Sequence, residues 1–321
     1  MSSTEMVPKP KRVSLKSLPA MAFQHPLDMK ATESLKKIKG FDWLTAKFVE
    51  YGIERIAYVH HVGGSIRVSP KQYSKHYTML LECCEILDVP EPELYVMQGG
   101  VNAFTSGHNH PFVVLETGLL ELMDDDNEVM AVIAHELGHI KCGHVLYKTM
   151  ARGIKPFLEI AGKATLGVGG LVGTTIEAGL SAWNRRSELS ADRAALLVMQ
   201  DSQPCISMLM KLAGGTERHV EWLDTEQFLN QARAYKEGLD DKMSDRFYRF
   251  IANMGATHPF AVERARALDE WVSSPQYNQV LLGNYSGIGQ LSPARICPTC
   301  GQPAQEGDKF CPNCATPLPV H

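Results

Sequence analysis

Apolar side chains recur at every third or fourth position over most of the chain, the spacing that buries one face of a helix. We therefore predict a mainly helical fold. The segments with this pattern are 28–40, 43–59, 71–88, 128–152, 184–200, 203–213, 217–238, 242–254 and 260–273. Carboxylates at the front of 128–152, with Lys148 and Arg152 at its back, complement the helix dipole and give this helix a well-marked start.

Strand patterns are short and confined to one part of the chain. Residues 93–98 follow Pro90 and Pro92 and have the composition of a strand. Two β-compatible runs, 101–106 and 111–122, are joined by Gly-His-Asn-His, which predicts a hairpin over 101–117 at the edge of a small sheet and fits a solvated turn better than a metal site. The expected fold class is α+β, mainly helical with a small edge sheet.

Changes in composition divide the chain into four parts. Residues 1–40 contain eight Lys and Arg against three Asp and Glu, and we predict that 1–22 forms a basic flexible arm. A globular domain is expected over 23–285, a linker over 286–296 and a small cysteine-rich unit over 297–321.

Charge and hydropathy exclude some classes of protein. The formal net charge of -4 disfavours a strongly basic nucleic-acid binder. Thirteen uncharged residues lie between Lys163 and Glu177, fewer than the ~20 apolar residues that a membrane span needs. Peripheral contact of 153–183, or of the basic arm, with a membrane surface is left as an alternative.

The cysteines and the amino-terminal segment bear on the compartment. No apolar run of signal-peptide length precedes residue 24. Eight cysteines in so long a chain do not resemble a disulfide framework, and their placement favours metal and thiol chemistry under reducing conditions. We therefore expect a cytoplasmic protein.

The strongest chemical signal is His135-Glu136-Leu137-Gly138-His139, an HExxH motif. Four residues of helix rotate by about 400°, so both imidazoles share one face and can bind a single ion. Glu136 lies about 100° from His135, where a carboxylate beside the metal can take a proton from the attacking water. The motif predicts a zinc site with Glu136 as general base.

A zinc site of this kind needs a third protein ligand. Glu188 and Asp192 place two carboxylates at i and i+4 on one helical face. One can bind zinc while the other accepts the second N–H of a ligand histidine and fixes its tautomer. The alternative is a solvated acidic face paired with nearby arginines, and the HExxH motif in the same chain favours the metal site.

Further motifs follow one another between residues 24 and 275. They are Asn102-Ala103-Phe104, Gly118-Leu119-Leu120, HELGH at 135–139, RRSELSADRAA at 185–195, and His258-Pro259 followed by Arg264. In this order they resemble the HtpX-like and CAAX-prenyl-protease-like zinc metallopeptidases, which are gluzincins. Integral-membrane members have transmembrane helices around the peptidase core, whereas no segment of this chain is long enough, so it resembles a soluble bacterial or organellar relative.

The resemblance implies roles for the residues that match the family's motifs. His135, His139 and Glu188 would be the zinc ligands, and Glu136 would be the base. Asp192 would be a partner of a ligand histidine, most plausibly His135.

The resemblance also extends beyond the ligands. His258 would lie close to the metal and stabilise the transition state, and Arg264 is a weaker candidate for such a donor just outside the ligands. Asn102 and Ala103 would bind substrate, because the unpaired edge of the 101–117 hairpin could add a peptide as another strand.

Two matching CPxC pairs near the carboxyl end predict a second metal site. Their four thiolates can close a tetrahedral structural zinc site in a compact zinc ribbon, and the ligands are Cys297, Cys300, Cys311 and Cys314. Segment 291–321 has as many acidic as basic side chains, so no nucleic-acid contact is expected. The ribbon is a candidate for binding a protein partner.

These patterns together predict a zinc-dependent endopeptidase that acts on protein or peptide substrates, with one catalytic and one structural Zn2+ per chain. Two alternatives are a non-catalytic scaffold whose ribbon binds a partner, and a membrane-surface adaptor. The intact HExxH motif argues against a scaffold, because a scaffold has no need of Glu136.

Overall fold

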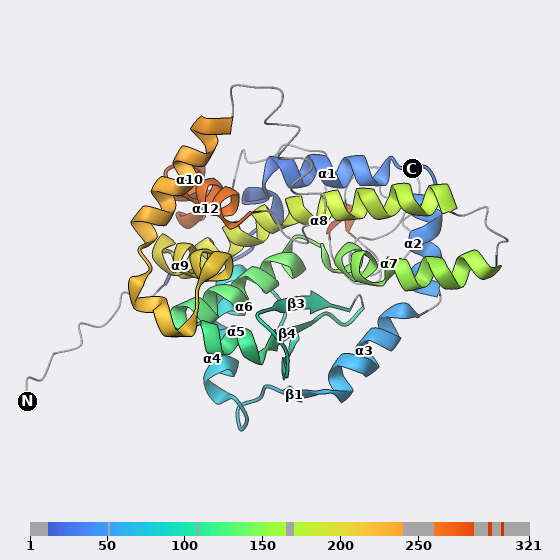
Figure 1. Cartoon of the computed structure of the whole chain (residues 1–321), viewed down its shortest axis with the longest axis horizontal. Helices are drawn as coiled ribbons and strands as arrows, with labels where there is room; N and C mark the ends of the chain where they lie inside the picture. The colour runs from blue at the N-terminus through green and yellow to red at the C-terminus, as the bar shows by residue number, and fades with distance from the viewer. Residues whose placement is uncertain are drawn as a thin grey trace, which may run out of the picture.

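A computed structural model of the chain gives the arrangement of its elements (Figure 1). The residues that the structure describes are 12–50, 52–107, 109–164, 170–239, 260–285, 295–296 and 303–304. Helices account for most of them, as predicted. They are α1 (Pro26–Lys36), α2 (Phe41–Glu50), α3 (Ile53–Gly63), α4 (Ser74–Leu87), α5 (Thr117–Leu122), α6 (Asp126–Lys141), α7 (Val145–Ala164), α8 (Gly170–Met199), α9 (Ser202–Gly214), α10 (Thr225–Leu239), α12 (Ala261–Val272) and α13 (Pro275–Leu281), with the 3-10 helices η1 (Ala20–Ala22) and η2 (Glu217–Trp222).

Three of the predicted helices are each divided in two, and two of these divisions occur at glycines. Segment 43–59 forms parts of α2 and α3, which are separated at Gly52, where φ is 62°. Segment 128–152 forms α6 and part of α7, and Gly143 between them has a φ of 70°. Glycine adopts this left-handed conformation without a steric penalty. The apolar periodicity continues across both turns, so it did not predict either of them.

Helix α8 is longer than predicted, and smaller elements were not predicted. It begins at Gly170 and ends at Met199, so it contains all but the last residue of 184–200. Segment 217–238 divides into η2 and α10. The β-compatible run 111–122 is wrong over its second half, which forms α5, and the predictions omitted α13 and the strand β1 (Ser65–Arg67). These elements are short, so their apolar periodicity is weak.

A four-stranded sheet lies beside the helices in the order β1-β2-β4-β3. The predicted strand is β2 (Glu93–Met97), and it pairs in parallel with β4 (Phe112–Glu116). The predicted hairpin consists of β3 (Ala103–Ser106) and β4, antiparallel with Ala103 opposite Leu115. Strand β3 is an edge strand, which confirms a hairpin at the edge of a small sheet.

The two faces of the sheet pack on different clusters, because side chains alternate along a strand. Val113 and Leu115 face the main core, which α4, α6, α8 and α9 also form. Val114 and Phe104 face the other way, against Tyr58 of α3. The sheet is therefore covered on both sides and holds β3 firmly next to α6.

Helices α6 and α8 pack at very short range, and this contact brings the two halves of the predicted metal site together. A Cβ atom at Gly138 would lie 2.6 Å from Cβ of Ala194 and 3.0 Å from Cα of Ala191. Such distances leave no room for any side chain at this position. The glycine inside HELGH and the alanines after Glu188 thus let the two backbones approach.

The prediction of a flexible arm over 1–22 is wrong for residues 12–22. Leu15 and Leu18 are buried in the main core, and the amide of Leu15 donates to the carbonyl of Ile86. Arg12 reaches Glu82 with Nη1–Oε1 at 2.7 Å. A few apolar side chains fix residues 12–22 against α4. The prolines and charges of this segment are typical of a flexible arm, which is why the prediction was wrong. Residues 1–11 lie outside the described residues.

Several predicted segments cannot be compared with the structure. The helix at 242–254, most of the linker at 286–296 and the four ribbon cysteines lie outside the described residues. The short strands β5 (Arg295–Ile296) and β6 (Pro303–Ala304) pair with each other in antiparallel fashion. Within the described ranges, none of the helices combines the length and the apolar character that crossing a bilayer requires.

Candidate metal centre

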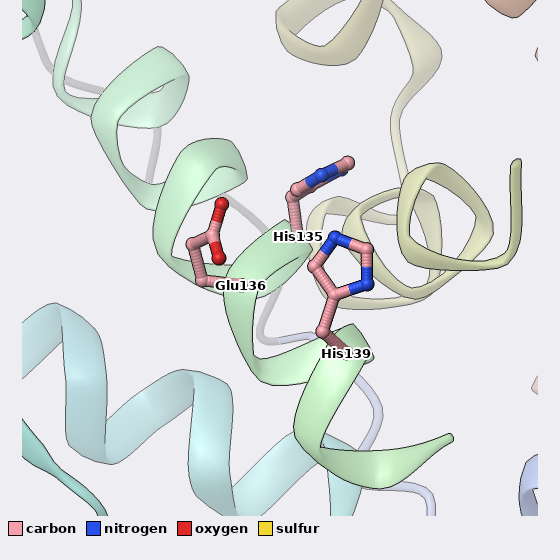
Figure 2. A group of neighbouring side chains, drawn as sticks. All are labelled: His135, Glu136 and His139. Atoms are coloured by element: carbon pink, nitrogen blue, oxygen red, sulfur yellow. The ribbon is translucent and has the colours of Figure 1, made fainter. Parts of the chain in front are cut away.

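Helix α6 carries the HExxH motif through the core of the domain. Its amino end is capped by the side chain of Asp125, which accepts a hydrogen bond from the amide of Asn127. His135 and His139 project from one face of the helix toward α8, whereas Glu136 points to a different side (Figure 2). The two rings are perpendicular, with centroids 4.9 Å apart. Both are buried, so their nitrogens have lost water and need polar partners.

Glu188 of α8 faces both histidines and is fully buried. Its Oε2 lies 3.3 Å from Nε2 of His135, and its Oε1 lies 3.4 Å from Nε2 of His139. Ligand atoms about 2.0–2.1 Å from a tetrahedral zinc lie about 3.3–3.4 Å from one another. Two imidazoles and a carboxylate are also the donors that catalytic zinc sites use, so this set of side chains fits a zinc ion.

A buried lysine contacts the same atoms. The Nζ of Lys148 in α7 donates to Oε1 of Glu188 at 2.6 Å and lies 2.9 Å from Nε2 of His139. The ammonium thus sits where the carboxylate and the ring lone pair converge. The contact shows that this group of atoms attracts a positive charge.

His135 is held by an ionic arrangement. Its Nδ1 lies 3.0 Å from Oδ1 of Asp192, one turn beyond Glu188 on α8. Arg264 of α12 donates twice to Asp192, with Nη2–Oδ1 at 2.6 Å and Nε–Oδ2 at 2.8 Å. Burial acts to lower the pKa of His135, but the hydrogen bonds to Asp192 and Glu188 raise it to about 9. Arg264 in turn helps to hold the pKa of Asp192 low against the opposing effect of burial.

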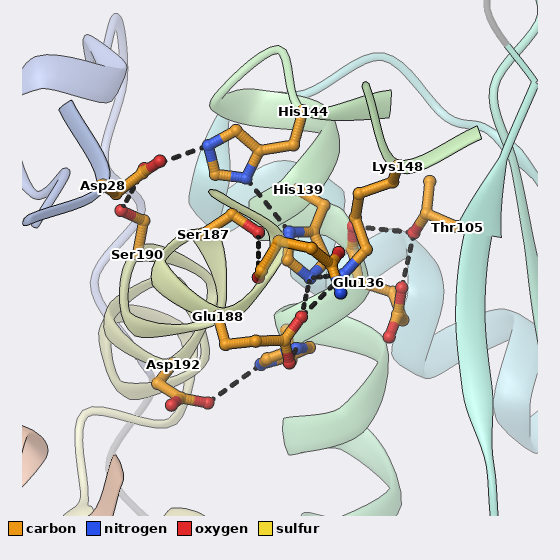
Figure 3. Close-up of polar contacts among 12 residues, drawn as sticks. Asp28, Thr105, Glu136, His139, His144, Lys148, Ser187, Glu188, Ser190 and Asp192 are labelled. Atoms are coloured by element: carbon orange, nitrogen blue, oxygen red, sulfur yellow. Dashed lines mark hydrogen bonds and ion pairs between the residues drawn. The ribbon is translucent and has the colours of Figure 1, made fainter. Parts of the chain in front are cut away.

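His139 is held differently, through a second imidazole (Figure 3). Its Nδ1 lies 3.0 Å from Nδ1 of His144, and Nε2 of His144 lies 3.0 Å from Oδ2 of Asp28 in α1. The same oxygen of Asp28 accepts from Oγ of Ser190 at 2.6 Å. Burial and the nearby Lys148 hold the pKa of His139 well below its ordinary value. His139 is therefore neutral, whereas His135, with its raised pKa, would release a proton when a metal ion binds.

Glu136 is held by the edge strand. Oγ1 of Thr105 in β3 donates to Oε2 of Glu136 at 2.7 Å, and lies 3.0 Å from the backbone carbonyl of Glu136 (Figure 3). Ligand-type atoms of Glu136, His135 and His139 lie within 4.8 Å of one another. The carboxylate is thus beside the histidine pair, at the place expected for a base.

A cleft of about 860 Å³ opens onto His135, Glu136 and Glu188. Asn102 and Ala103, the two residues predicted to bind substrate, line it from the start of the edge strand. Arg264 lines it as well. Much of the remaining wall is apolar. It includes Met208 and Leu212 of α9, Phe228 and Tyr235 of α10, and Leu223 and Phe260, which precede α10 and α12.

The structure therefore brings together the predicted residues of the catalytic site that it describes. His258 and the four cysteines lie outside the described residues, so these contacts do not test their predicted roles. Sequence reasoning missed Thr105, Asp28 and the support that His144 gives to His139. Five residues of continuous helix would set His144 about 140° round from His139, which predicts that it does not bind the same ion directly. In the structure it contacts His139 at the ring nitrogen that faces away from Glu188.

Comparison with known proteins agrees with this geometry. A sequence model of Peptidase family M48 matches residues 71–272. The chain is also 38% identical over 270 residues to Plastoglobule-localized metallopeptidase 48, chloroplastic, of Arabidopsis thaliana, which covers 83% of this chain and 76% of that protein. The chain belongs to peptidase family M48. It is thus a zinc-dependent metalloprotease, a hydrolase.

Other M48 relatives are proteins named as HtpX homologues. Protease HtpX homolog 2 of Methanosarcina acetivorans is 27% identical over 178 residues, which is 48% of this chain and 60% of that protein. A Protease HtpX homolog of Burkholderia multivorans is 29% identical over 234 residues, 63% of this chain and 75% of that protein. The resemblance predicted from the motifs is therefore confirmed.

A zinc-ribbon model matches residues 296–318, which supports the predicted ribbon. The M48 match contains the HExxH motif, Glu188, Asp192 and Arg264. It begins after α1, so Asp28 lies outside it.

Proposed function

We propose that this M48 protein is an endopeptidase in which His135, His139 and Glu188 bind the catalytic zinc and Glu136 is the general base. The position of Glu188 carries this proposal. A carboxylate from α8, buried among two imidazoles of α6 at 3.3 and 3.4 Å, forms a donor set that suits zinc. Bound zinc would supply a Lewis acid that polarises the scissile carbonyl and acidifies water.

Glu136 would move the proton. It would take a proton from the water that attacks the scissile carbonyl and pass it to the leaving amine, a role worth about 10²–10⁴-fold in rate. Thr105 donates to Oε2 of Glu136, which fixes one carboxylate oxygen and leaves the other to face the reacting atoms. His258 is our candidate for a donor to the oxyanion, on the strength of the motif alone.

The cleft favours an extended peptide with an apolar side chain beside the scissile bond. The carbonyl of Asn102 accepts from the amide of Glu116 in β4, so the amide and carbonyl of Ala103 point away from the sheet. A peptide could pair there as a further strand. Met208, Leu212 and Phe228 line the cleft and would contact an apolar side chain favourably.

The second zinc is proposed for the ribbon. Cys297, Cys300, Cys311 and Cys314 would bind it and stabilise that unit, giving one catalytic and one structural zinc per chain. The ribbon would contact a protein partner, and a cytoplasmic location is proposed from the reduced cysteines. Metal analysis tests the stoichiometry: we expect about two zinc atoms per chain, and about one in either His135→Ala or Cys297→Ser.

Glu136→Gln tests the chemistry. The variant keeps the shape of the side chain but cannot accept the proton, so casein cleavage should fall at least ~100-fold while zinc content stays at the wild-type value. Glu121→Gln, an exposed carboxylate on α5, is the matched control and should retain wild-type activity. Unchanged casein cleavage by zinc-loaded Glu136→Gln would remove Glu136 as the base and favour a scaffold.

A further inference from the structure

A chain of buried polar groups connects the motif histidine His139 to helix α1. His139, His144 and Asp28 are in contact through successive distances of 3.0 Å, and each is at most 2% exposed. The chain ends on Asp28, which lies before the part of the sequence that the M48 model matches. Nothing in the proposed mechanism uses Asp28 or His144 directly.

The contact between the two rings allows only one direction of donation when both are neutral. A neutral imidazole has one N–H and one lone pair. The two Nδ1 atoms are 3.0 Å apart, so one must donate and the other accept. If His139 donates, its Nε2 keeps the lone pair that faces Glu188. If His139 accepts, its proton is on Nε2 and that nitrogen cannot bind a metal.

Lys148 and Asp28 both favour the first of these arrangements. The Nζ of Lys148, which can only donate, lies 2.9 Å from Nε2 of His139. At the other end of the chain, an ionised carboxylate can only accept hydrogen bonds, and Oδ2 of Asp28 lies within hydrogen-bond distance of His144, Ser190 and Gln24. Its Oδ2 lies 3.0 Å from Nε2 of His144, which must therefore carry a proton. In neutral His144 the lone pair is then on Nδ1, where it accepts from His139.

We infer that Asp28 is a positioning residue that fixes the tautomer of His139 through His144 and so presents Nε2 of His139 to the metal. The inference rests on the proposed role of His139 as a zinc ligand. This role would explain why the carboxylate of Asp28 in α1 is buried against α8. Ser190 and Gln24 also donate to that carboxylate.

Asp28→Asn tests the inference in the full-length protein, because an amide can both donate and accept. Spectra of ¹⁵N-histidine-labelled protein report the protonated nitrogen of each ring. They also report zinc at the histidine site alone, since the proposed ligands of the second zinc are cysteines. Wild-type His139 should carry its proton on Nδ1. In Asp28→Asn both tautomers should appear, with zinc affinity at this site lowered about 10–100-fold.

Gln24→Met is the matched control. It removes another hydrogen bond to the same oxygen of Asp28 without adding a donor that could face His144. The tautomer of His139 and its zinc affinity should stay as in the wild type. A purely structural role for Asp28 would change stability in both variants and the tautomer in neither.

A second pair of variants keeps the test decisive if Asp28→Asn does not fold. His144→Gln retains one acceptor and one donor and should keep His139 in the Nδ1–H form, whereas His144→Leu has neither and should lose zinc affinity. Equal affinities in these two variants would refute the inference.

The two possible failures are distinguishable. Wild-type tautomer and affinity in Asp28→Asn, with zinc lost in His135→Ala, would refute the role of Asp28 and leave the zinc site standing. Histidine signals that do not respond to zinc in the wild-type protein would refute the proposed site itself.

Discussion

The two histidines of the HExxH motif are supported in different ways, although they are one turn apart on the same helix. His135 contacts an ionic pair, Asp192 with Arg264, and its pKa is raised to about 9. His139 contacts a second imidazole, His144, and the pKa of His139 is held well below the ordinary value, mainly by burial. Asp192 with Arg264 thus forms an ionic arm in direct contact with His135, whereas His144 with Asp28 forms a relay arm of hydrogen bonds that ends on a carboxylate.

The two histidines of the HExxH motif are therefore oriented by side chains from separate parts of the fold. The supports of His135 come from α8 and α12, within the M48 match. The support of His139 ends in α1, outside that match. The ionic arm contacts its ring directly, whereas the relay arm places its carboxylate one imidazole further away. Glu188 faces both histidines, and variants that act on one arm, or on both, can test the comparison.

The largest effect is expected where the two arms meet. Glu188→Gln replaces a carboxylate by a neutral amide, a poor zinc ligand, so zinc affinity at the histidine site should fall by more than the ~10–100-fold typical of residues outside the ligands. Metal analysis after dialysis should find about one zinc per chain, retained by the ribbon. Glu85→Gln, on the exposed side of α4, is the control. Full zinc retention by Glu188→Gln would mean that Glu188 is not a ligand.

A smaller effect is expected from breaking the ionic arm alone. Asp192→Asn removes the carboxylate that Arg264 contacts twice and leaves its longer contact of 3.6 Å with Oε2 of Glu188. Losing one partner of a buried pair costs about 3–5 kcal/mol in the free energy of unfolding. Zinc affinity should fall about 10–100-fold. Urea unfolding and zinc competition measure the two quantities. Oδ2 of Asp28 contacts His144, Ser190 and Gln24, and none of these is an arginine with a permanent charge. Asp28→Asn should therefore lower the free energy of unfolding by less than Asp192→Asn does.

A double variant separates the two consequences of this change. Adding Arg264→Met to Asp192→Asn removes the unpaired charge, so much of the stability should return while zinc affinity stays low. If both quantities returned together, the ionic pair would serve stability and not the orientation of His135.

The smallest effect, and one of opposite sign, is expected from the lysine on the His139 side. Lys148→Met removes a positive charge from beside Glu188 and His139, so zinc affinity should rise, on the order of tenfold given the strength of buried charge interactions. Without zinc, Glu188 loses its 2.6 Å partner and the protein should unfold at a lower temperature. Thermal unfolding with added zinc and with chelator measures both changes. A fall in zinc affinity would instead make Lys148 a support of the bound ligand.

Much of the catalytic site could be predicted because it depends on local spacing. HExxH places two imidazoles on one face at i and i+4, and ExxxD does the same for Glu188 and Asp192, whatever the rest of the chain does. The predicted hairpin is also local, since its link is short. By contrast, the angle used to set His144 aside assumed a continuous helix, and α6 ends at Lys141 before the turn at Gly143.

Thr105, Asp28 and Lys148 could not be predicted in the same way. A threonine in a strand, a carboxylate in an amphipathic helix and a lysine near a helix end are ordinary residues at their positions in the sequence. They become parts of the site only because β3, α1 and α7 pack around α6 and α8. The buried Leu15 and Leu18 are a similar case, since two leucines in a charged segment give no periodic signal.

The sequence by itself predicted the proposed ligand pairs and the proposed general base and indicated the family of this protein, because these depend on residue types at fixed spacing along single helices. The tertiary structure alone decided which side chains orient those residues. Contacts over long separations depend on how closely helices approach, as at Gly138 against Ala191 and Ala194. A buried donor or acceptor there must find a partner from whichever element lies next to it, and no spacing rule names that element.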